Sequence, residues 1–205
     1  MVQRRRRLLD VEAILDAALA CVDERGRLTM ADLAARLGVS AASIYHHVSG
    51  RQEIVELLRE RLVVRLELPR LDRSEWSAQV AAWMRSYRQA LAEHPSLIPL
   101  LSEQTMTAGS VLLGYDRVAA LLGRAGFPED EVVLWVSVLD SYALGSALDL
   151  AAPDEVWRVG DGDTPALDAA LRAAPQGRAR ADAAFDLGLD ALLAGMHARL
   201  PVSGG

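Results

Sequence analysis

Apolar residues recur every three to four positions along nearly the whole chain, a spacing that predicts an all-α protein. No stretch alternates apolar and polar residues as a half-buried strand would. Residues 151–177 contain three prolines and three glycines, and we expect them to form a long loop. The expected helices span residues 10–25, 30–37, 41–47, 50–68, 74–93, 107–124, 129–150 and 178–199, with a short apolar segment at 96–103.

Capping residues divide the first fifty positions into three helices, two of them short. Thr29 precedes the second helix as an N-cap, with Asp32 three residues later, and Gly38 ends that helix. Ser40 is a suitable N-cap for the third helix. Ser49 followed by Gln52 has the pattern of a capping box, which opens the longer helix 50–68.

The segment 28–54, LTMADLAARLGVSAASIYHHVSGRQEI, is predicted to be a helix-turn-helix. Leu33, Ala34 and Leu37 give its first helix an inner face, and Gly38 permits the left-handed conformation of the turn. Val39 fills the gap between the helices, and Ile44 anchors the second helix from below. The residues left for the outer face or the helix end are Ser43, Tyr45, His46 and His47, behind a slim leading turn of Ala41 and Ala42.

This segment resembles the DNA-binding domain of the tetracycline-repressor (TetR) family. The family pattern is an apolar residue and Ala, then Gly-Val-Ser, then Leu-Tyr-x-His-Phe and a Lys three residues later. The matching elements are Leu33-Ala34, Gly38-Val39-Ser40, Ile44-Tyr45-His46-His47-Val48 and Arg51. Two positions depart from the pattern, since Val48 replaces the common Phe and Arg51 replaces the usual Lys. Arg51 would hold a phosphate with a fork rather than a point charge.

The resemblance implies that Tyr45, His47 and Arg51 contact the DNA backbone, together with Thr29 at a helix N-terminus that favours anions. Two of these residues have an alternative role. Thr29 either contacts phosphate or serves only as a cap, and His47 either contacts phosphate or packs internally against the first helix. Direct reading of bases would then depend on Ser43, Tyr45 and His46, because Ala31, Ala41 and Ala42 offer only contacts to thymine methyl groups. Part of the specificity would come from DNA shape. Ser40, Ala41 and Ala42, at the start of the third helix, complete the set of residues expected to contact DNA.

Charge is distributed unevenly in a chain whose net charge is −6 and which has no lysine. Residues 1–65 carry a balance of +2 and residues 66–205 a balance of −8. Such a distribution suits a protein that touches a polyanion at one end only. The single cysteine, Cys21, excludes an internal disulfide framework, and we see no secretory signal or uniform membrane-spanning run. We therefore expect a cytoplasmic protein.

A run of four arginines, Arg4, Arg5, Arg6 and Arg7, precedes the first helix. Arginine in such an arm can enter a narrow minor groove of DNA. The alternative is a solvated tail.

Beyond residue 70 the resemblance is one of architecture only. It implies an N-terminal arm and helix-turn-helix domain over residues 1–50, a connecting helix over 51–68, and a helical ligand-binding and dimerisation domain over 69–205. Aromatic and methionine side chains on the helical stripes of this last domain either pack its core or line a mostly apolar pocket. The candidates for contact with an apolar or aromatic ligand are Trp83, Tyr87, Met106, Tyr115 and Trp135.

Small residues form stripes on two helices of the C-terminal domain, which suggests close approach of another helix. Members of the family dimerise by packing two such helices from each subunit, whereas the alternative is packing within one chain. The predicted homodimer contacts are Ala143, Gly145, Ala147, Ala184, Gly188, Ala191 and Gly195.

An enzyme and a metal sensor are the two functions that the sequence disfavours. No HExxH, CxxC, phosphate-binding glycine loop or nucleophile elbow is present, so we expect no catalytic residue, cofactor or metal. The resemblance implies a repressor that a small ligand releases from its operator. A transcriptional activator, or a DNA-binding protein of the same fold that needs no ligand, remains the alternative.

We predict that deletion of residues 1–7 reduces the dependence of DNA affinity on salt. An arginine arm that binds phosphates releases counterions, so its deletion lowers the slope of log affinity against log salt concentration, by about 0.9 for each phosphate that the arm neutralises. Titrations at several salt concentrations measure the slope, and an unchanged slope would identify the arm as a solvated tail.

Overall fold

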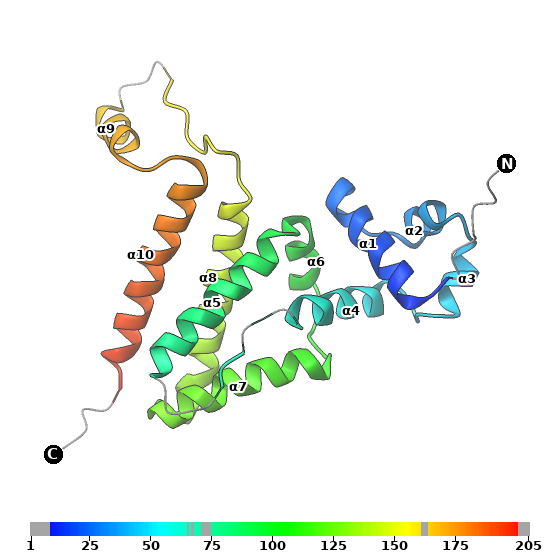
Figure 1. Ribbon diagram of the computed structural model, residues 1–205, viewed down its shortest axis with the longest axis horizontal. Coiled ribbons are helices and arrows are strands. Elements are labelled where there is room, and N and C mark those ends of the chain that lie inside the picture. Colours follow the sequence, from blue (N-terminus) through cyan, green and yellow to red (C-terminus); the bar gives the residue numbers. More distant parts are fainter. Residues whose placement is uncertain (1–8, 65, 67, 71–74, 161–163, 201–205) are drawn as a thin grey trace. The chain divides into compact units, whose positions relative to one another are not determined.

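The computed structural model describes residues 9–64, 66, 68–70, 75–160 and 164–200, and this part of the chain holds helices and no strand (Figure 1). Its elements in chain order are α1 (Val11–Arg25), α2 (Met30–Leu37), α3 (Ala41–Tyr45), α4 (Arg51–Val63), α5 (Trp76–Ala92), the 3-10 turn η1 (Pro95–Leu97), α6 (Ile98–Ser102), α7 (Gly109–Ala125), α8 (Glu129–Leu150), α9 (Pro165–Ala173) and α10 (Gly177–His197). The predicted all-α fold is confirmed.

The helices form two compact units. The first consists of Met1–Arg65 and His94–Gly114, and the second of Leu66–Glu93 and Tyr115–Gly205. Helix α7 therefore begins in the first unit and continues into the second. This division differs from the linear domain boundaries expected from the sequence, because η1, α6 and the start of α7 pack with the helices that precede residue 65.

The first unit is built around α1, which packs against α2, α4 and η1. Asp10 begins α1 by accepting a hydrogen bond from the Ala13 N–H at 2.8 Å, and Gly26 ends it with φ 65°. The side chains that meet in this core are completely buried and come from four helices: Ile14, Ala18, Val22, Leu33, Ile44, Ile54 and Val55.

A largely buried ion pair fastens α4 to the segment that follows α6. Arg59 donates from Nε to Glu56 at 3.1 Å and from Nη2 to the Leu101 carbonyl at 2.7 Å. The other oxygen of Glu56 accepts the backbone N–H groups of Thr107 at 3.0 Å and Ala108 at 3.1 Å, in the turn that opens α7. Burial acts to raise the pKa of Glu56, but these N–H bonds and Arg59 outweigh it, so that the pKa lies below its ordinary value. Helix α4 is thus held to both ends of the α6–α7 connection.

The second unit has α8 at its centre, packed against both α5 and α10. The core side chains include Val80, Met84, Leu122, Leu139 and Leu189, all completely buried. A buried arginine, Arg88, links the three helices: it donates to Asp182 at 2.7 Å and to the Ser146 carbonyl at 3.4 Å, and its guanidinium lies 4.5 Å from the centre of the Phe185 ring.

Three local predictions are corrected by the structure. Helix α4 ends at Val63 rather than 68, because Val63 and Val64 are β-branched and Val64 is 80% exposed, so burial supports no further turn. The expected capping box does not form with Gln52, since it is Glu53 that accepts the Ser49 N–H. The expected loop 151–177 contains helix α9, in which Pro165 occupies the first turn, where proline favours a helix start.

Helix α8 is the one helix among the described residues that is long and apolar enough to cross a membrane, with a mean hydropathy of 1.3 over its most apolar window. No such span was expected from the sequence. The inner side of α8 packs in the core through Val132 and Leu139, whereas four large apolar residues on its outer side remain exposed: Val133, Leu134, Val138 and Leu148.

Gly188 lets α8 and α10 approach closely within one chain. The Tyr142 hydroxyl of α8 donates to the Phe185 carbonyl of α10 at 2.8 Å and lies directly over Gly188. A Cβ atom at residue 188 would stand 2.1 Å from that hydroxyl oxygen. The Tyr142 and Phe185 rings stack with centroids 5.6 Å apart, so the tyrosine has little freedom to move away.

We predict that Gly188→Ala destabilises the protein by about 1–3 kcal/mol, the usual cost of overpacking a core. Urea unfolding followed by circular dichroism measures the change. Gly123→Ala is the matched control, because Gly123 is also helical but a Cβ there meets nothing within 4 Å. The control is expected to be neutral or to stabilise by up to about 1 kcal/mol through helix propensity. Equal effects at the two glycines would contradict the proposed close approach.

Candidate functional sites

Helix α3 is short and is held at both ends by its own local sequence. Gly38 adopts φ 67° and ends α2, and the Val39 N–H then returns to the Ala34 carbonyl at 3.1 Å. The Ser40 hydroxyl accepts the Ser43 N–H at 3.2 Å as the N-cap of α3. Completely buried Ile44 fixes the helix from beneath. Helix α3 ends at Tyr45, two residues earlier than expected, and a turn carries the chain through His47 to buried Val48.

The outer side of this helix presents the residues that the sequence pattern assigned to DNA. Tyr45 is 52% exposed, and His46 and His47 are exposed as well. The expected alternative for His47, packing against the first helix, is therefore wrong. Ala42 is exposed and Ala41 half-buried, so the leading turn is slim. Ser43 is half-buried, and its hydroxyl forms a hydrogen bond of 2.9 Å with the hydroxyl of Ser40.

Thr29 serves as the N-cap of α2, the structural role that was expected for it beside a possible contact with phosphate. Its hydroxyl accepts the Asp32 N–H at 3.0 Å and donates to the Asp32 carboxylate at 2.7 Å. This hydroxyl hydrogen bond, opposed by desolvation and aided by Arg25 and Arg27, lowers the pKa of Asp32. The hydroxyl is thus already engaged within the chain, although the half-buried residue keeps its place at the start of α2.

Arg51 stands at the start of α4 and has partners within the first unit. Its Nε donates to the Leu28 carbonyl at 3.1 Å, and its Nη2 lies 3.4 Å from the Glu103 carboxylate. The side chain remains 38% exposed. A lysine could not make the Nε contact in the same geometry. Arg51, which replaces the usual Lys of the family pattern, therefore connects α4 to the loop before α2. The four arginines Arg4, Arg5, Arg6 and Arg7 lie outside the described residues.

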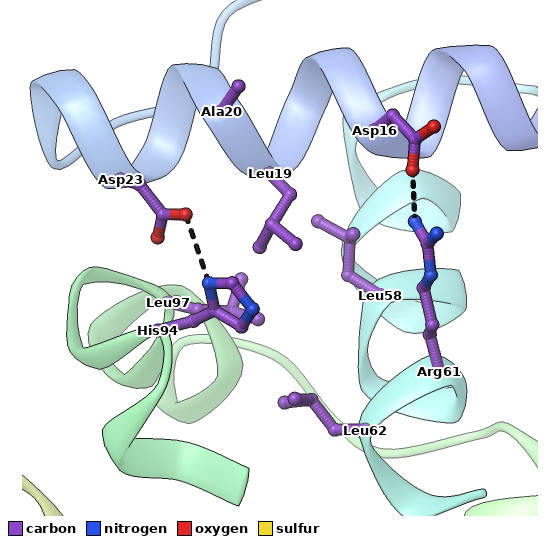
Figure 2. A pocket seen from close by; sticks show the side chains of 9 residues that line it. All are labelled: Asp16, Leu19, Ala20, Asp23, Leu58, Arg61, Leu62, His94 and Leu97. Atoms are coloured by element: carbon purple, nitrogen blue, oxygen red, sulfur yellow. Dashed lines mark hydrogen bonds and ion pairs between the residues drawn. The ribbon is translucent and has the colours of Figure 1, made fainter. Parts of the chain in front are cut away.

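A hollow of about 230 Å³ lies where α1, α4 and η1 meet (Figure 2). Leucines line its middle, and a polar contact lies at each side: Arg61 forms an ion pair with Asp16 at 2.8 Å, and the His94 Nδ1 lies within hydrogen-bonding distance of Asp23, at 2.9 Å. These two pairs link the first helix to α4 and to η1. Because they are partly exposed, salt screens them, and each contributes about 1 kcal/mol or less.

Three of the five ligand candidates lie together in the second unit. Tyr87 and Tyr115 donate to the same carboxylate oxygen of Asp140, at 2.9 and 2.6 Å. The Trp83 ring stacks on Tyr87 at 5.6 Å and meets Tyr115 edge-on at 6.4 Å. Burial, together with Tyr115 and Asp140, raises the pKa of Tyr87 well above its ordinary value, so its phenol stays protonated. Asp140, the acceptor that brings the two phenols together, was not among the residues predicted from the sequence.

The other two candidates do not join this group. Trp135 packs edge-on against Phe127 at 6.4 Å, near the start of α8. Phe127 in turn contacts Trp76, so these rings form a separate aromatic cluster in the core. Met106 is half-buried in the first unit, in the turn before α7.

The predicted dimer contacts are divided between the inside and the outside of the chain. Ala143 and Ala147 are completely buried against the core, and Gly188 lies beneath Tyr142, so all three pack intramolecularly and their assignment is corrected. Gly145, Ala184, Ala191 and Gly195 are exposed. The large apolar residues that share their faces were missed: Leu134, Val138 and Leu148 on α8, and Leu187, which is 75% exposed, on α10. Together with Gly145, Ala184 and Ala191 they recur at intervals of three, four or seven residues, which place them on one face of each helix, and this helical periodicity is the signal that would have found them.

The described residues contain no group of three or more His, Cys, Asp or Glu side chains that could hold a metal ion. Cys21 is buried on the inner side of α1.

Comparison with known proteins gives matches at both ends of the chain. Residues 14–58 match the model for bacterial regulatory proteins of the tetR family, and residues 68–200 match that of the tetracyclin repressor-like C-terminal domain. An HTH-type transcriptional regulator from Saccharopolyspora erythraea is 31% identical over 95% of this chain and 87% of its own length. A class A tetracycline repressor protein from Escherichia coli is 28% identical over 93% and 92%.

Solved structures share the fold. ActR of Streptomyces coelicolor, in a crystal structure in complex with actinorhodin, superposes with a TM-score of 0.75, at 23% identity and over 94% of this chain and 98% of that one.

We predict that His46→Ala and Ser43→Ala reduce the discrimination between specific and nonspecific DNA severalfold, because each removes a group able to hydrogen-bond a base edge. Binding titrations on both DNAs measure the ratio. If selectivity is unchanged in both variants, DNA shape alone provides the specificity.

Proposed function

Since the chain belongs to the tetracycline-repressor family of bacterial transcriptional regulators, we propose that it represses transcription by binding an operator as a homodimer and leaves the operator when a small, mostly apolar molecule binds. The observation that carries the proposal is the exposed outer side of α3 and of the turn after it, with Tyr45 on the helix, which Ile44 anchors, and His46 and His47 in the turn. A short helix with an exposed polar end is what the major groove of DNA accepts.

Homodimerisation is supported by an exposed apolar surface on α8 and α10, which we call the α8–α10 face. It consists of Leu134, Val138, Gly145 and Leu148 on α8 with Ala184, Leu187 and Ala191 on α10. Contiguous apolar surface of this kind marks an interaction site. Two copies joined by this face would present two recognition helices, and specific binding needs two half-sites about 34–36 Å apart on the duplex. Such a protein acts in the cytoplasm, where its operator is.

The effector site that we propose is the group formed by Trp83, Tyr87, Tyr115 and Asp140. Apolar rings with a few convergent polar groups are typical of small-molecule sites. Relatives solved with bound compounds include ActR with actinorhodin and a TetR from Acinetobacter baumannii with minocycline. By analogy, an aromatic molecule with hydrogen-bonding substituents would fit a site made of aromatic rings and two phenols on one carboxylate.

Helix α7 offers a route by which the effector site could influence DNA binding. It carries Tyr115, and the turn that opens it is bound by Glu56 of α4. A displacement of Tyr115 would move the start of α7 and, through Glu56 and Arg59, the helix that follows the recognition helix. Such coupling is typically worth about 1–3 kcal/mol and is reciprocal, so the operator would weaken effector binding by the same factor. We propose no catalytic step.

Activation instead of repression is the second candidate, because the position of the operator relative to the promoter decides whether binding lowers or raises transcription.

The test is to isolate genomic fragments that the purified protein retains, and then to measure their release by a panel of aromatic compounds that includes actinorhodin and minocycline. We expect a small set of palindromic fragments and release by at least one compound. Tyr87→Phe should raise the concentration needed for release, whereas Trp135→Phe, in the separate aromatic cluster, should not. Retention of all fragments alike would contradict sequence-specific regulation, and selective fragments that no compound releases would favour a ligand-independent DNA-binding protein.

A further inference from the structure

The hollow where α1, α4 and η1 meet belongs entirely to the first compact unit, and we call it the α1 hollow (Figure 2). None of its lining residues belongs to the group around Asp140 that we propose as the effector site. Its volume of about 230 Å³ exceeds the roughly 150 Å³ of a protein cavity known to hold one benzene molecule. A single aromatic ring with a short side chain therefore fits the α1 hollow.

Four leucines give the α1 hollow an apolar middle: Leu19 of α1, Leu58 and Leu62 of α4, and Leu97 of η1. Leu58 and Leu97 are each only 1% exposed, so they belong to the core beneath the hollow, whereas Leu19 is half-buried. Their positions are fixed by the packing of the first unit. The apolar surface for a ring is thus formed before any ligand arrives, as is usual for small-molecule sites.

Charge at the two sides of the α1 hollow favours a cation. Arg61 lies 2.8 Å from Asp16 and 3.7 Å from Glu12, so two carboxylates already surround this one arginine. On the other side, the partner of Asp23 is the His94 ring, which is charged only when it is protonated. Asp23 is 38% exposed and can therefore accept a cationic group without giving up an arginine.

We propose that the α1 hollow binds a small amphipathic amine, whose ring lies on the leucines and whose ammonium group pairs with Asp23. The site is separate from the proposed effector site, and neither depends on the other. Helix α1 packs against α4 and against α2, and α2 packs against the recognition helix α3. A ligand in the α1 hollow therefore acts on the DNA-binding unit itself.

The first experiment tests the charge of the ligand. Phenethylamine is titrated into the full chain by calorimetry, with the neutral phenethyl alcohol and the anionic hydrocinnamate as analogues of similar size. We expect the amine to bind about three- to fivefold more tightly than the alcohol, because a partly exposed ion pair contributes about that much. The carboxylate should bind most weakly. Equal affinity for amine and alcohol, or tighter binding of the carboxylate, would overturn the proposal.

Asp23→Asn tests the residue that we assign to the ammonium group. The substitution keeps the size of the side chain and removes its charge, so the preference for the amine over the alcohol should fall to about onefold. Asp130→Asn is the matched control, since it removes the same charge from an exposed position at the start of α8, in the second unit. It should leave the preference unchanged. Circular dichroism checks that both variants are folded.

The ring resonances of the histidines report where the amine binds. The chain has four histidines, and among them His94 alone lines the α1 hollow. Phenethylamine should shift the His94 signals in NMR spectra, identified by their loss in His94→Gln, and leave those of His46 and His197 in place.

The outcomes separate this site from the effector site. Amine binding that Tyr87→Phe weakens and that leaves His94 unshifted would belong to the effector group, and it would overturn the site in the α1 hollow while the proposed function stands. Operator binding and its release by effectors do not enter these measurements, so the proposed function can also fail without the α1 hollow losing its ligand.

Discussion

The pair formed by Glu56 and Arg59 is the interaction on which the first unit depends. Both side chains lie almost entirely out of solvent on α4, and each reaches beyond the other to the backbone, Arg59 to Leu101 and Glu56 to Thr107 and Ala108. A buried charge without a partner is strongly unfavourable, so the two groups hold each other in place as well as the segments they bind. Helix α4, the α6 turn and the start of α7 therefore form one assembly behind the recognition helix.

The recognition helix, α3, is too short for its own backbone hydrogen bonds to stabilise it. Five residues cannot sustain a helix in water, and α3 persists because Ser40 caps it, Gly38 sets the turn before it, and Ile44 is completely buried beneath it. Because so few of its side chains are needed for packing, the outer side of α3 is free. Tyr45, His46 and His47 are exposed because the packing of this segment requires only Ile44 and Val48, and this division between inner and outer residues leaves their side chains accessible.

Helix α8 has apolar residues on two sides, one that packs in the core and one that is exposed. Its inner side packs in the core through Leu139 and Ala143, and Asp140 gathers the phenols of Tyr87 and Tyr115. Its outer side is equally apolar but is exposed, which explains why a helix with an Asp near its middle still has the composition of a membrane span. Exposed apolar surface of this kind is typical of an interaction site.

Local sequence determined most of the helices, their caps and which side of α3 is exposed, because helical spacing, Thr29, Gly38 and Ser40 act over a few residues. The prediction of a loop over residues 151–177 was wrong for α9, because Pro165 occupies the first turn of that helix. Tertiary structure alone decided the rest. The stripe of Ala143, Ala147 and Gly188 looked like an interface in sequence, but small residues mark close approach without naming the partner, and here the partner is Tyr142 or the core of the same chain. Contacts between distant segments, such as Glu56 with Thr107 or Asp140 with Tyr87, depend on packing that no spacing along the chain encodes.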